Sequence, residues 1–384
     1  MKPSIAIVGA GIGGLSCALA LQRVGFSAQV YDQMTVASEV GAGIGLWPGA
    51  VTSLAEIGIA DWFWKLPVCR FQRAETCTPD GRVLTGFDVS AITRGDGFVV
   101  RRADLHRALL EMVDPTRMTL GSELVGLGQD RDGVNLSFAD GSAARFDLVI
   151  GADGLRSVVR AALRGAAEPR YSGETCFRGM SAVAVEDTGT LREVQGRGRR
   201  CAVHPLDAGH VYWWAAVRTA ADSRDAPEQR KEMLARAFRG WEFGFPEALV
   251  ATPAETILRN DLFDRRALKK WSAGRVTLLG DAAHPTTPNL GLGGCMAIED
   301  ALVLARALSE RDGRPEAAFG QYERERHRRT AEVVRMSAMF GRLGSMTGRR
   351  RVRVREDLMS LAPTALMARA FARPVSYQPG PLAR

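Results

Sequence analysis

The stretch SIAIVGAGIGGLSCALALQRVGFSAQVYD, residues 4–32, decides the fold of this chain. It begins with an apolar β-type run, continues with the glycine pattern Gly9-x-Gly11-x-x-Gly14, and then has the apolar spacing of a helix and a second strand that ends at Asp32. Strand, glycine turn, helix, strand and acid in this order are typical of a unit that binds a dinucleotide. The start of the helix would face the pyrophosphate with its free N–H groups. An acid at position 32 can bind ribose hydroxyls and disfavours a 2′-phosphate, so the pattern favours FAD or NAD over NADP at this site.

The composition is that of a soluble globular protein with room for two domains. The chain has 384 residues, of which 46% are hydrophobic and 24% are charged. We find no run of 18 apolar residues, and glycines interrupt the N-terminal apolar stretch at once. We therefore expect neither a membrane span nor a signal peptide. The net charge of +8 comes largely from arginines, which we interpret as a solvated surface and not as a nucleic-acid site.

The six cysteines and five histidines form no CxxC pair and no group with the spacing of metal ligands. We expect reduced thiols, no metal site and a cytoplasmic protein.

Two later segments extend the pattern of the opening stretch. RFDLVIGADGLRSVV, residues 145–159, is an apolar strand that runs into Asp153 and Gly154, and RVTLLGDAAHP, residues 275–285, is an apolar strand that ends at Gly280 and Asp281. With the three motifs in this order, the chain resembles the FAD-dependent aromatic hydroxylases, which are single-component flavoprotein monooxygenases. The resemblance extends over roughly residues 4–335. It implies an α/β fold: a Rossmann-like FAD-binding domain with an inserted, mostly antiparallel β-sheet substrate domain and a C-terminal helical segment.

We predict a discontinuous FAD-binding domain that comprises residues 1–70, 99–176 and 266–334. The substrate domain would comprise residues 71–98 and 177–265, where alternating runs such as HVYWWAAV (210–217) predict antiparallel strands. Residues 335–384 are predicted to be a basic, helical region that packs on the FAD domain, in preference to dimerising or touching a membrane surface. The chain has no second GxGxxG, so the reductant would bind transiently and without a domain of its own.

The resemblance assigns FAD contacts to the three motifs and to segments beside them. The residues concerned are Gly9, Gly11, Ile12, Gly13, Gly14, Asp32, Gln33, Gly43, Gly45, Arg102, Leu124, Asp153, Asp281, Pro288, Gly291, Leu292, Gly293, Gly294 and Cys295. Two positions depart from the family pattern: Asp32 stands where Glu is more usual, and Gly49, in the segment GAGIGLWPG (41–49), stands where Asn is usual.

The segment GDAAHPTTPNLGLGGCMAIED, residues 280–300, is expected to be the seat of the flavin. Asp281 would bind the ribityl and phosphate side of FAD, and Pro285 and Pro288 would stiffen the wall beside the ring. The glycines at 291, 293 and 294 would bring bare backbone up to the isoalloxazine. A helix that begins at Cys295 would direct its positive end toward N1 and O2 of the ring. We interpret Cys295 as a small buried residue and not as a nucleophile or a covalent flavin link.

The resemblance implies that non-covalently bound FAD is reduced by NADH or NADPH and then forms a C4a-hydroperoxide with molecular oxygen. This would hydroxylate a small aromatic or heteroaromatic substrate, with a preference for an anion. The candidate catalytic residues are His204, Tyr212 and Arg200, of which Arg200 and Tyr212 match a substrate-binding arginine and tyrosine of urate-hydroxylating members. His204 is expected to titrate near neutrality and to transfer protons.

Three alternatives stay open: a urate-type hydroxylase, an epoxidase or antibiotic-modifying monooxygenase with a larger apolar substrate, and a flavin-binding regulatory protein. The sequence does not choose between NADH and NADPH, or between a monomer and a homodimer.

Overall fold

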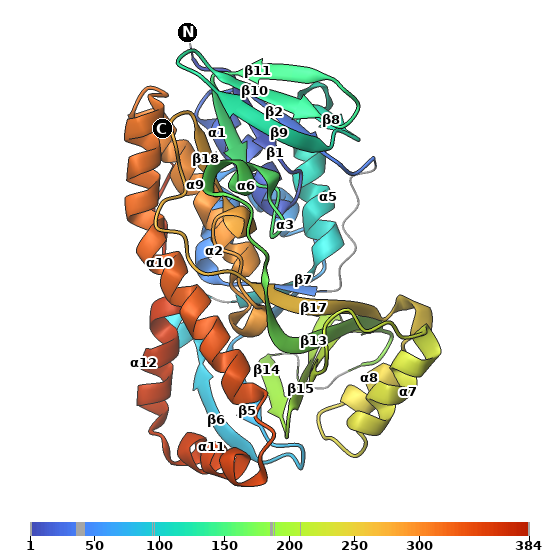
Figure 1. Cartoon of the computed structure of the whole chain (residues 1–384). Helices are drawn as coiled ribbons and strands as arrows, with labels where there is room; N and C mark the ends of the chain where they lie inside the picture. Colours follow the sequence, from blue (N-terminus) through green and yellow to red (C-terminus); the bar gives the residue numbers. More distant parts are fainter. Residues whose placement is uncertain are drawn as a thin grey trace.

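The structure is a computed structural model, and it describes residues 2–35, 43–93, 95, 97–184, 187, 189–207 and 209–382. Residues 41 and 42 of the segment GAGIGLWPG lie outside the described residues. The predicted fold class is confirmed: a parallel nucleotide-binding sheet, a large antiparallel sheet and C-terminal helices make up the molecule (Figure 1).

A five-stranded parallel sheet forms the centre of the nucleotide-binding part, in the order β18-β12-β1-β2-β8. Its strands are β1 (Ile5–Val8), β2 (Ala28–Asp32), β8 (Met118–Leu120), β12 (Leu148–Gly151) and β18 (Val276–Leu278). β1, β12 and β18 are the three apolar runs recognised in the sequence, and they lie side by side in register, with Val8 paired to Gly151 and Gly151 paired to Leu278. Every residue of these three strands is buried, which explains their continuous apolar character.

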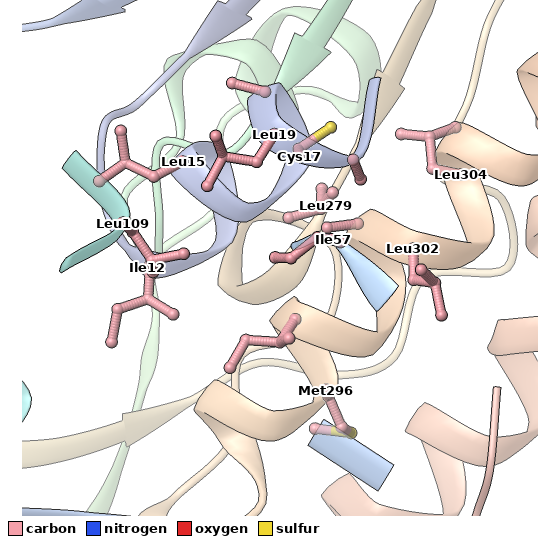
Figure 2. Close-up of a cluster of buried hydrophobic side chains, with 14 of the residues drawn as sticks. Ile12, Leu15, Cys17, Leu19, Ile57, Leu109, Leu279, Met296, Leu302 and Leu304 are labelled. Atoms are coloured by element: carbon pink, nitrogen blue, oxygen red, sulfur yellow. The ribbon is translucent and has the colours of Figure 1, made fainter. Parts of the chain in front are cut away.

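Helices cover this sheet and enclose its core. They are α1 (Ile12–Arg23), α2 (Pro48–Glu56), α3 (Ala60–Phe63), α5 (Arg102–Met112), α6 (Val158–Arg164), α9 (Gly293–Glu310) and α10 (Pro315–Gly344). Figure 2 shows Leu15, Cys17 and Leu19 of α1 in the same apolar cluster as Leu279 and Met296, which come from the late part of the chain. Residues nearly three hundred positions apart therefore build one core beside the first motif.

Two small antiparallel sheets flank the parallel one. One contains β9 (Leu124–Gln129), β10 (Val134–Phe138) and β11 (Ala143–Phe146), and the other contains β3 (Gly43–Leu46), β4 (Val68–Phe71) and β7 (Gly97–Arg101).

The large sheet has seven strands in the order β17-β13-β16-β15-β14-β5-β6. They are β5 (Arg73–Cys77), β6 (Val83–Asp88), β13 (Arg170–Ser181), β14 (Thr190–Gln195), β15 (Arg199–Asp207), β16 (His210–Arg218) and β17 (Leu258–Asp264). All neighbours are antiparallel except β5 and β14. α7 (Pro227–Ala237) and α8 (Phe245–Val250) pack at one end of this sheet, and α4 (Val89–Thr93) follows β6.

Two of the boundaries predicted for the domains fall inside long elements of the structure. Position 177 lies within β13, whose first strand residue is Arg170, because this long strand pairs with both β16 and β17. Position 335 lies within α10, which runs without a break from the nucleotide-binding part to the large sheet.

The C-terminal helices lie against the edge of the large sheet. α11 (Arg349–Leu361) and α12 (Thr364–Val375) contact β6, and Figure 1 shows them beside β5 and β6 at the far end of α10. The chain end then returns to the nucleotide-binding part, where the Leu382 amide donates to Glu56 at 2.9 Å. Within the described residues, no helix is long and apolar enough to cross a membrane.

Candidate active site

The glycine turn after β1 is packed so closely that it excludes side chains. Gly9 has a φ of +108°, and a Cβ atom at this position would overlap the carbonyl of Ala152 at the end of β12. A Cβ on Gly14 would overlap the carbonyl of Gly9. α1 can therefore start close to the end of the strand, and Gly11, which precedes the helix, and Gly13, in its first turn, line a large cavity.

Asp32 supports this turn from the end of β2. Its Oδ2 accepts a hydrogen bond from the Ala10 amide at 2.6 Å, and its Oδ1 accepts one from the Met34 amide at 2.8 Å. Neither Asp32 nor Gln33 lines the cavity, and the same holds for the buried Leu124. Their contacts with a ribose or an adenine stay predictions.

The second motif holds the start of α6. Asp153 Oδ2 accepts from the Val159 amide at 3.1 Å, while its buried Oδ1 has no hydrogen-bond partner among the described residues. Burial raises the pKa of Asp153. Its neighbours Ala152 and Gly154 line the cavity, whereas Asp153 itself does not.

A buried ion network fixes the third motif. Asp300 of α9 accepts hydrogen bonds from the Gly280 amide at 3.1 Å and from Arg326 Nε at 2.6 Å, and it contacts His284 Nε2 at 2.6 Å. Burial alone would raise the pKa of Asp300, but His284 and Arg326 outweigh it and lower the pKa to about 2. The network leaves the side chain of Asp281 exposed to the cavity beside Gly280.

The glycines of the loop line the cavity, and the helix after them begins earlier than expected. α9 starts at Gly293 and not at Cys295, because Gly293 and Gly294 already have helical backbone. Gly291, with a φ of +63°, lines the cavity together with Gly293 and Gly294, and the exposed Pro288 does so as well.

Cys295 and Leu292 are buried behind the wall of the cavity and do not line it. The thiol of Cys295 lies 3.5 Å from the Trp47 amide and 3.4 Å from the Gly45 carbonyl, so it fastens β3 to α9. Burial raises the pKa of this thiol to about 12, which makes it unreactive near neutral pH.

On the opposite side, the large sheet presents its own side chains to the same cavity. Tyr212 and Trp214 come from β16, His204 and Arg200 from β15, and Arg178 from β13. All three predicted catalytic residues are therefore in the cavity wall.

His204 differs from the expectation in its ionisation. Its Nε2 accepts a hydrogen bond from Trp214 Nε1 at 3.1 Å, and its buried Nδ1 has no partner among the described residues. Burial lowers the pKa of His204 to about 4. The prediction that it titrates near neutrality is wrong, because desolvation disfavours the imidazolium and the basic nitrogen is occupied.

Arg200 is engaged by neighbouring side chains. It is 2% exposed, and it donates to Glu174 at 3.1 and 3.3 Å, to Glu193 at 3.3 Å and to the side-chain oxygen of Asn289. Two carboxylates therefore balance its single charge. An anionic substrate would have to displace a glutamate from Arg200, so the expected preference for anions does not follow from this residue.

Tyr212 lies against the segment that precedes the flavin-side helix α2. It is 8% exposed, its ring occupies the space that a Cβ on Gly43 would need, and burial raises its pKa to about 12. The phenol is therefore protonated at neutral pH. Arg178, which the sequence analysis did not single out, donates to the Asn260 side chain at 2.8 Å and lines the cavity beside Tyr212.

The cavity that these elements enclose has a volume of about 1500 Å³, larger than an ordinary small-molecule site. A third group of lining residues comes from α10, α11 and α12, among them Met339, Phe340, Leu343 and Phe371. No motif in the sequence marks these residues as part of a site. Apolar residues recur among the arginines of this region, but the helical pattern alone does not say which surface they cover.

Comparison with known proteins identifies the cofactor. A family profile described as an FAD binding domain matches residues 2–337. An aurachin C monooxygenase/isomerase from Stigmatella aurantiaca is 35% identical over 383 residues, which cover 98% of both chains. A 3-amino-4-hydroxybenzoate 2-monooxygenase from Streptomyces platensis is 35% identical over 399 residues, covering 99% of this chain and 98% of the relative. This chain belongs to the FAD-dependent aromatic hydroxylases.

Solved structures agree with this assignment. The FAD-dependent hydroxylase described here matches Klebsiella pneumoniae HpxO, crystallised with FAD and uric acid, with a TM-score of 0.89 and 28% identity over 99% of this chain and 98% of that one. The protein is an FAD-dependent monooxygenase.

The residues in the cavity fit FAD. The turn of Gly11 and Gly13 would provide backbone N–H groups and the positive end of α1 for a pyrophosphate. Gly45 opens onto free space, since a Cβ there would meet no atom within 4 Å. Arg102 and Asp281 line the same cavity. When bound, FAD supplies the redox chemistry and the activation of oxygen.

Proposed function

We propose that this monooxygenase oxidises NADH or NADPH and inserts one atom of molecular oxygen into an aromatic ring. The reduced nucleotide supplies two electrons, one oxygen atom becomes the new hydroxyl group, and the other leaves as water. The observation that carries the proposal is a single cavity whose wall joins the flavin-binding glycines to Tyr212, Arg178 and Trp214 of the large sheet.

Tyr212 and Arg178 suit an electron-rich ring that carries an ionisable oxygen. Because its pKa is raised to about 12, Tyr212 stays protonated and can donate a hydrogen bond to a substrate oxygen. The guanidinium of Arg178 favours the deprotonated form of a phenol, and a phenolate ring is the more reactive one toward an electrophilic oxygen. We therefore propose that Arg178, and not Arg200, gives the site its preference for an anionic group.

The neutral side chains of His204 and Trp214 disfavour water beside the reacting atoms. His204 is neutral and hydrogen-bonded to Trp214, so we assign it the role of positioning the indole. A dry wall matters because the activated oxygen would otherwise be lost as hydrogen peroxide.

A substrate panel tests the proposal. Purified, yellow holoenzyme is mixed with NADH or NADPH and with phenols, hydroxybenzoates, aminohydroxybenzoates and urate in turn. We expect stimulated oxidation of the nucleotide and a product that is heavier by one oxygen atom. Stimulation with hydrogen peroxide as the only product from every aromatic would contradict the proposal, and so would the absence of stimulation.

Replacing Tyr212 by Phe tests whether the hydroxyl group of Tyr212 contributes to hydroxylation. Phe keeps the ring against Gly43 but cannot donate a hydrogen bond, so hydroxylation should fall by one to two orders of magnitude, about the 1.5–3 kcal/mol of a hydrogen bond to a charged group. Flavin content should stay as in the parent enzyme. Unchanged turnover would remove Tyr212 from the site.

A further inference from the structure

We infer that the substrate of this enzyme is an aromatic compound with a long hydrocarbon chain, and that the chain lies in an apolar compartment between β5, β6 and the C-terminal helices. The inference rests on the proposed function, since it assumes that the aromatic head lies beside the flavin. It specifies the substrate class of the same site.

The compartment is continuous with the flavin site. The same cavity that contains Gly293 and Tyr212 in its wall extends to Ala74 of β5 and Phe87 of β6, and to Phe371 of α12. FAD would fill the part of this cavity of about 1500 Å³ that is lined by the glycines, Arg102 and Asp281, and a single aromatic ring beside the flavin would leave the extension toward Phe371 empty.

The walls of the compartment are built from apolar side chains of several elements. The ring of Phe371 lies 5.0 Å from that of Phe87 and 4.9 Å from that of Phe340, measured between centroids. Leu343 and Met346, at the end of α10 and just after it, continue the lining. Flexible methionines and aromatic rings of this kind suit a hydrocarbon chain.

Glu75 and Arg355, two charged groups in this part of the wall, are paired with protein groups, whereas Arg350 and Arg351 line the cavity from the exposed start of α11. Glu75 is 2.9 Å from Arg192, and Arg355 donates to two backbone carbonyls at 3.1 and 3.4 Å. Glu75 and Arg355 therefore do not require a charged ligand, and the two exposed arginines lie on α11, the helix that also carries Val354 and Leu358.

The compartment opens to solvent at α11. Val354 and Leu358 line the cavity and are nevertheless 57% and 64% exposed, and Ala370 of α12 lines it from the neighbouring helix and is exposed as well. An opening of this kind allows hydrocarbon chains of different lengths to extend past the protein surface. A closed pocket for a small ring would not allow this.

A series of 4-alkylphenols, from methyl to octyl, tests the inference on the FAD-loaded enzyme. Binding is measured by the change in flavin absorbance and does not depend on turnover. We expect the Kd to fall by about fourfold for each added methylene, the value for burial of one CH₂ group. Equal Kd values for the methyl and octyl compounds would overturn the inference, and so would the absence of binding by every member.

Substitutions in the cavity wall test where the hydrocarbon chain of the substrate lies. Ala370→Trp should fill the opening, raise the Kd of 4-octylphenol at least tenfold and leave that of 4-methylphenol unchanged. Ala365→Trp, on the same helix but exposed and outside the cavity wall, should change neither value. Met339→Gln, a polar replacement of similar size in the wall, should also weaken octylphenol binding selectively.

If the Ala370→Trp and Met339→Gln variants bind 4-octylphenol as tightly as the parent enzyme does, the octyl chain does not lie in this compartment. Steep chain-length dependence without any hydroxylated product would instead contradict the proposed function and leave the compartment established.

Discussion

Gly14 shows how one residue determines whether the cofactor site exists. Its absent Cβ leaves room for the carbonyl of Gly9, and backbone atoms on both sides cannot move aside. We expect Gly14→Ala to lower the free energy of unfolding by about 1–3 kcal/mol through overpacking, and to abolish FAD binding because α1 shifts away from the turn. Urea unfolding and the ratio of flavin to protein are the measurements.

Gly128→Ala is the matched control for this change. Gly128 lies in β9, where a Cβ would meet no atom within 4 Å, so we expect a change within about 0.5 kcal/mol and full flavin content. A flavin-saturated Gly14→Ala variant would contradict the role assigned to this glycine.

The free energy of unfolding at acidic pH should depend on the burial of His204. Burial lowers its pKa from 6.5 to about 4, so the unfolded chain takes up a proton below pH 6.5 while the folded protein does not do so until about pH 4. The burial of neutral His204 therefore leaves the free energy of unfolding unchanged above pH 6.5. As the pH falls from 6.5 toward 4, it lowers the free energy of unfolding by about 3 kcal/mol in total.

His204→Gln tests this dependence, since Gln can still accept from Trp214 but does not titrate. Between pH 7 and pH 4.5, the free energy of unfolding of the parent protein should drop by about 2–3 kcal/mol more than that of the variant. Parallel losses in the two proteins would show that His204 is not buried in its neutral form.

At the scale of elements, the ion network around Asp300 connects the flavin loop to two helices. Asp300→Asn removes the charge that Arg326 and His284 share, and leaves Glu299, 2.8 Å from Arg326, as the remaining carboxylate there. We expect a loss of about 3–5 kcal/mol in the free energy of unfolding, together with weaker FAD binding, because the loop at Gly280 loses its anchor.

An exposed ion pair provides the comparison. Glu232→Gln breaks a contact of 2.9 Å with Arg236 on the surface of α7, where both side chains are more than two-thirds exposed. Its effect should be below about 1 kcal/mol, with no change in flavin content. Equal effects of the two substitutions would argue against a special role for the buried network.

At the scale of the whole molecule, the C-terminal segment joins the large sheet back to the nucleotide-binding part. The ring of Tyr377 lies 4.8 Å from the guanidinium groups of both Arg326 and Arg329, and its hydroxyl donates to Glu325 at 3.1 Å. Tyr377→Ala should lower the free energy of unfolding by about 2–4 kcal/mol, since it removes two cation–π contacts and a hydrogen bond.

Tyr377→Phe separates these contributions, because it keeps the ring and loses only the hydroxyl. We expect it to cost about 1 kcal/mol, and both variants can be compared by urea unfolding followed through flavin release. If Tyr377→Ala were no worse than Tyr377→Phe, the stacked arginines would not contribute.

The backbone of Tyr377 also explains a departure from the family pattern. A Cβ on Gly49 would overlap the Tyr377 carbonyl, so the returning chain occupies the space that a side chain at position 49 would need. Position 49 could be recognised as unusual from the sequence, but its cause lies more than three hundred residues away.

The sequence by itself determined the nucleotide-binding half of this protein. Gly9, Gly14 and the strands at 5–8, 148–151 and 276–278 follow from local rules, since tight turns and buried parallel strands tolerate few residue types. The tertiary structure alone decided the ionisation of His204, the pairing of Arg200 with Glu174 and the position of the C-terminal helices over the cavity. These properties depend on burial and on neighbours distant in the chain, and no local pattern of residues encodes them.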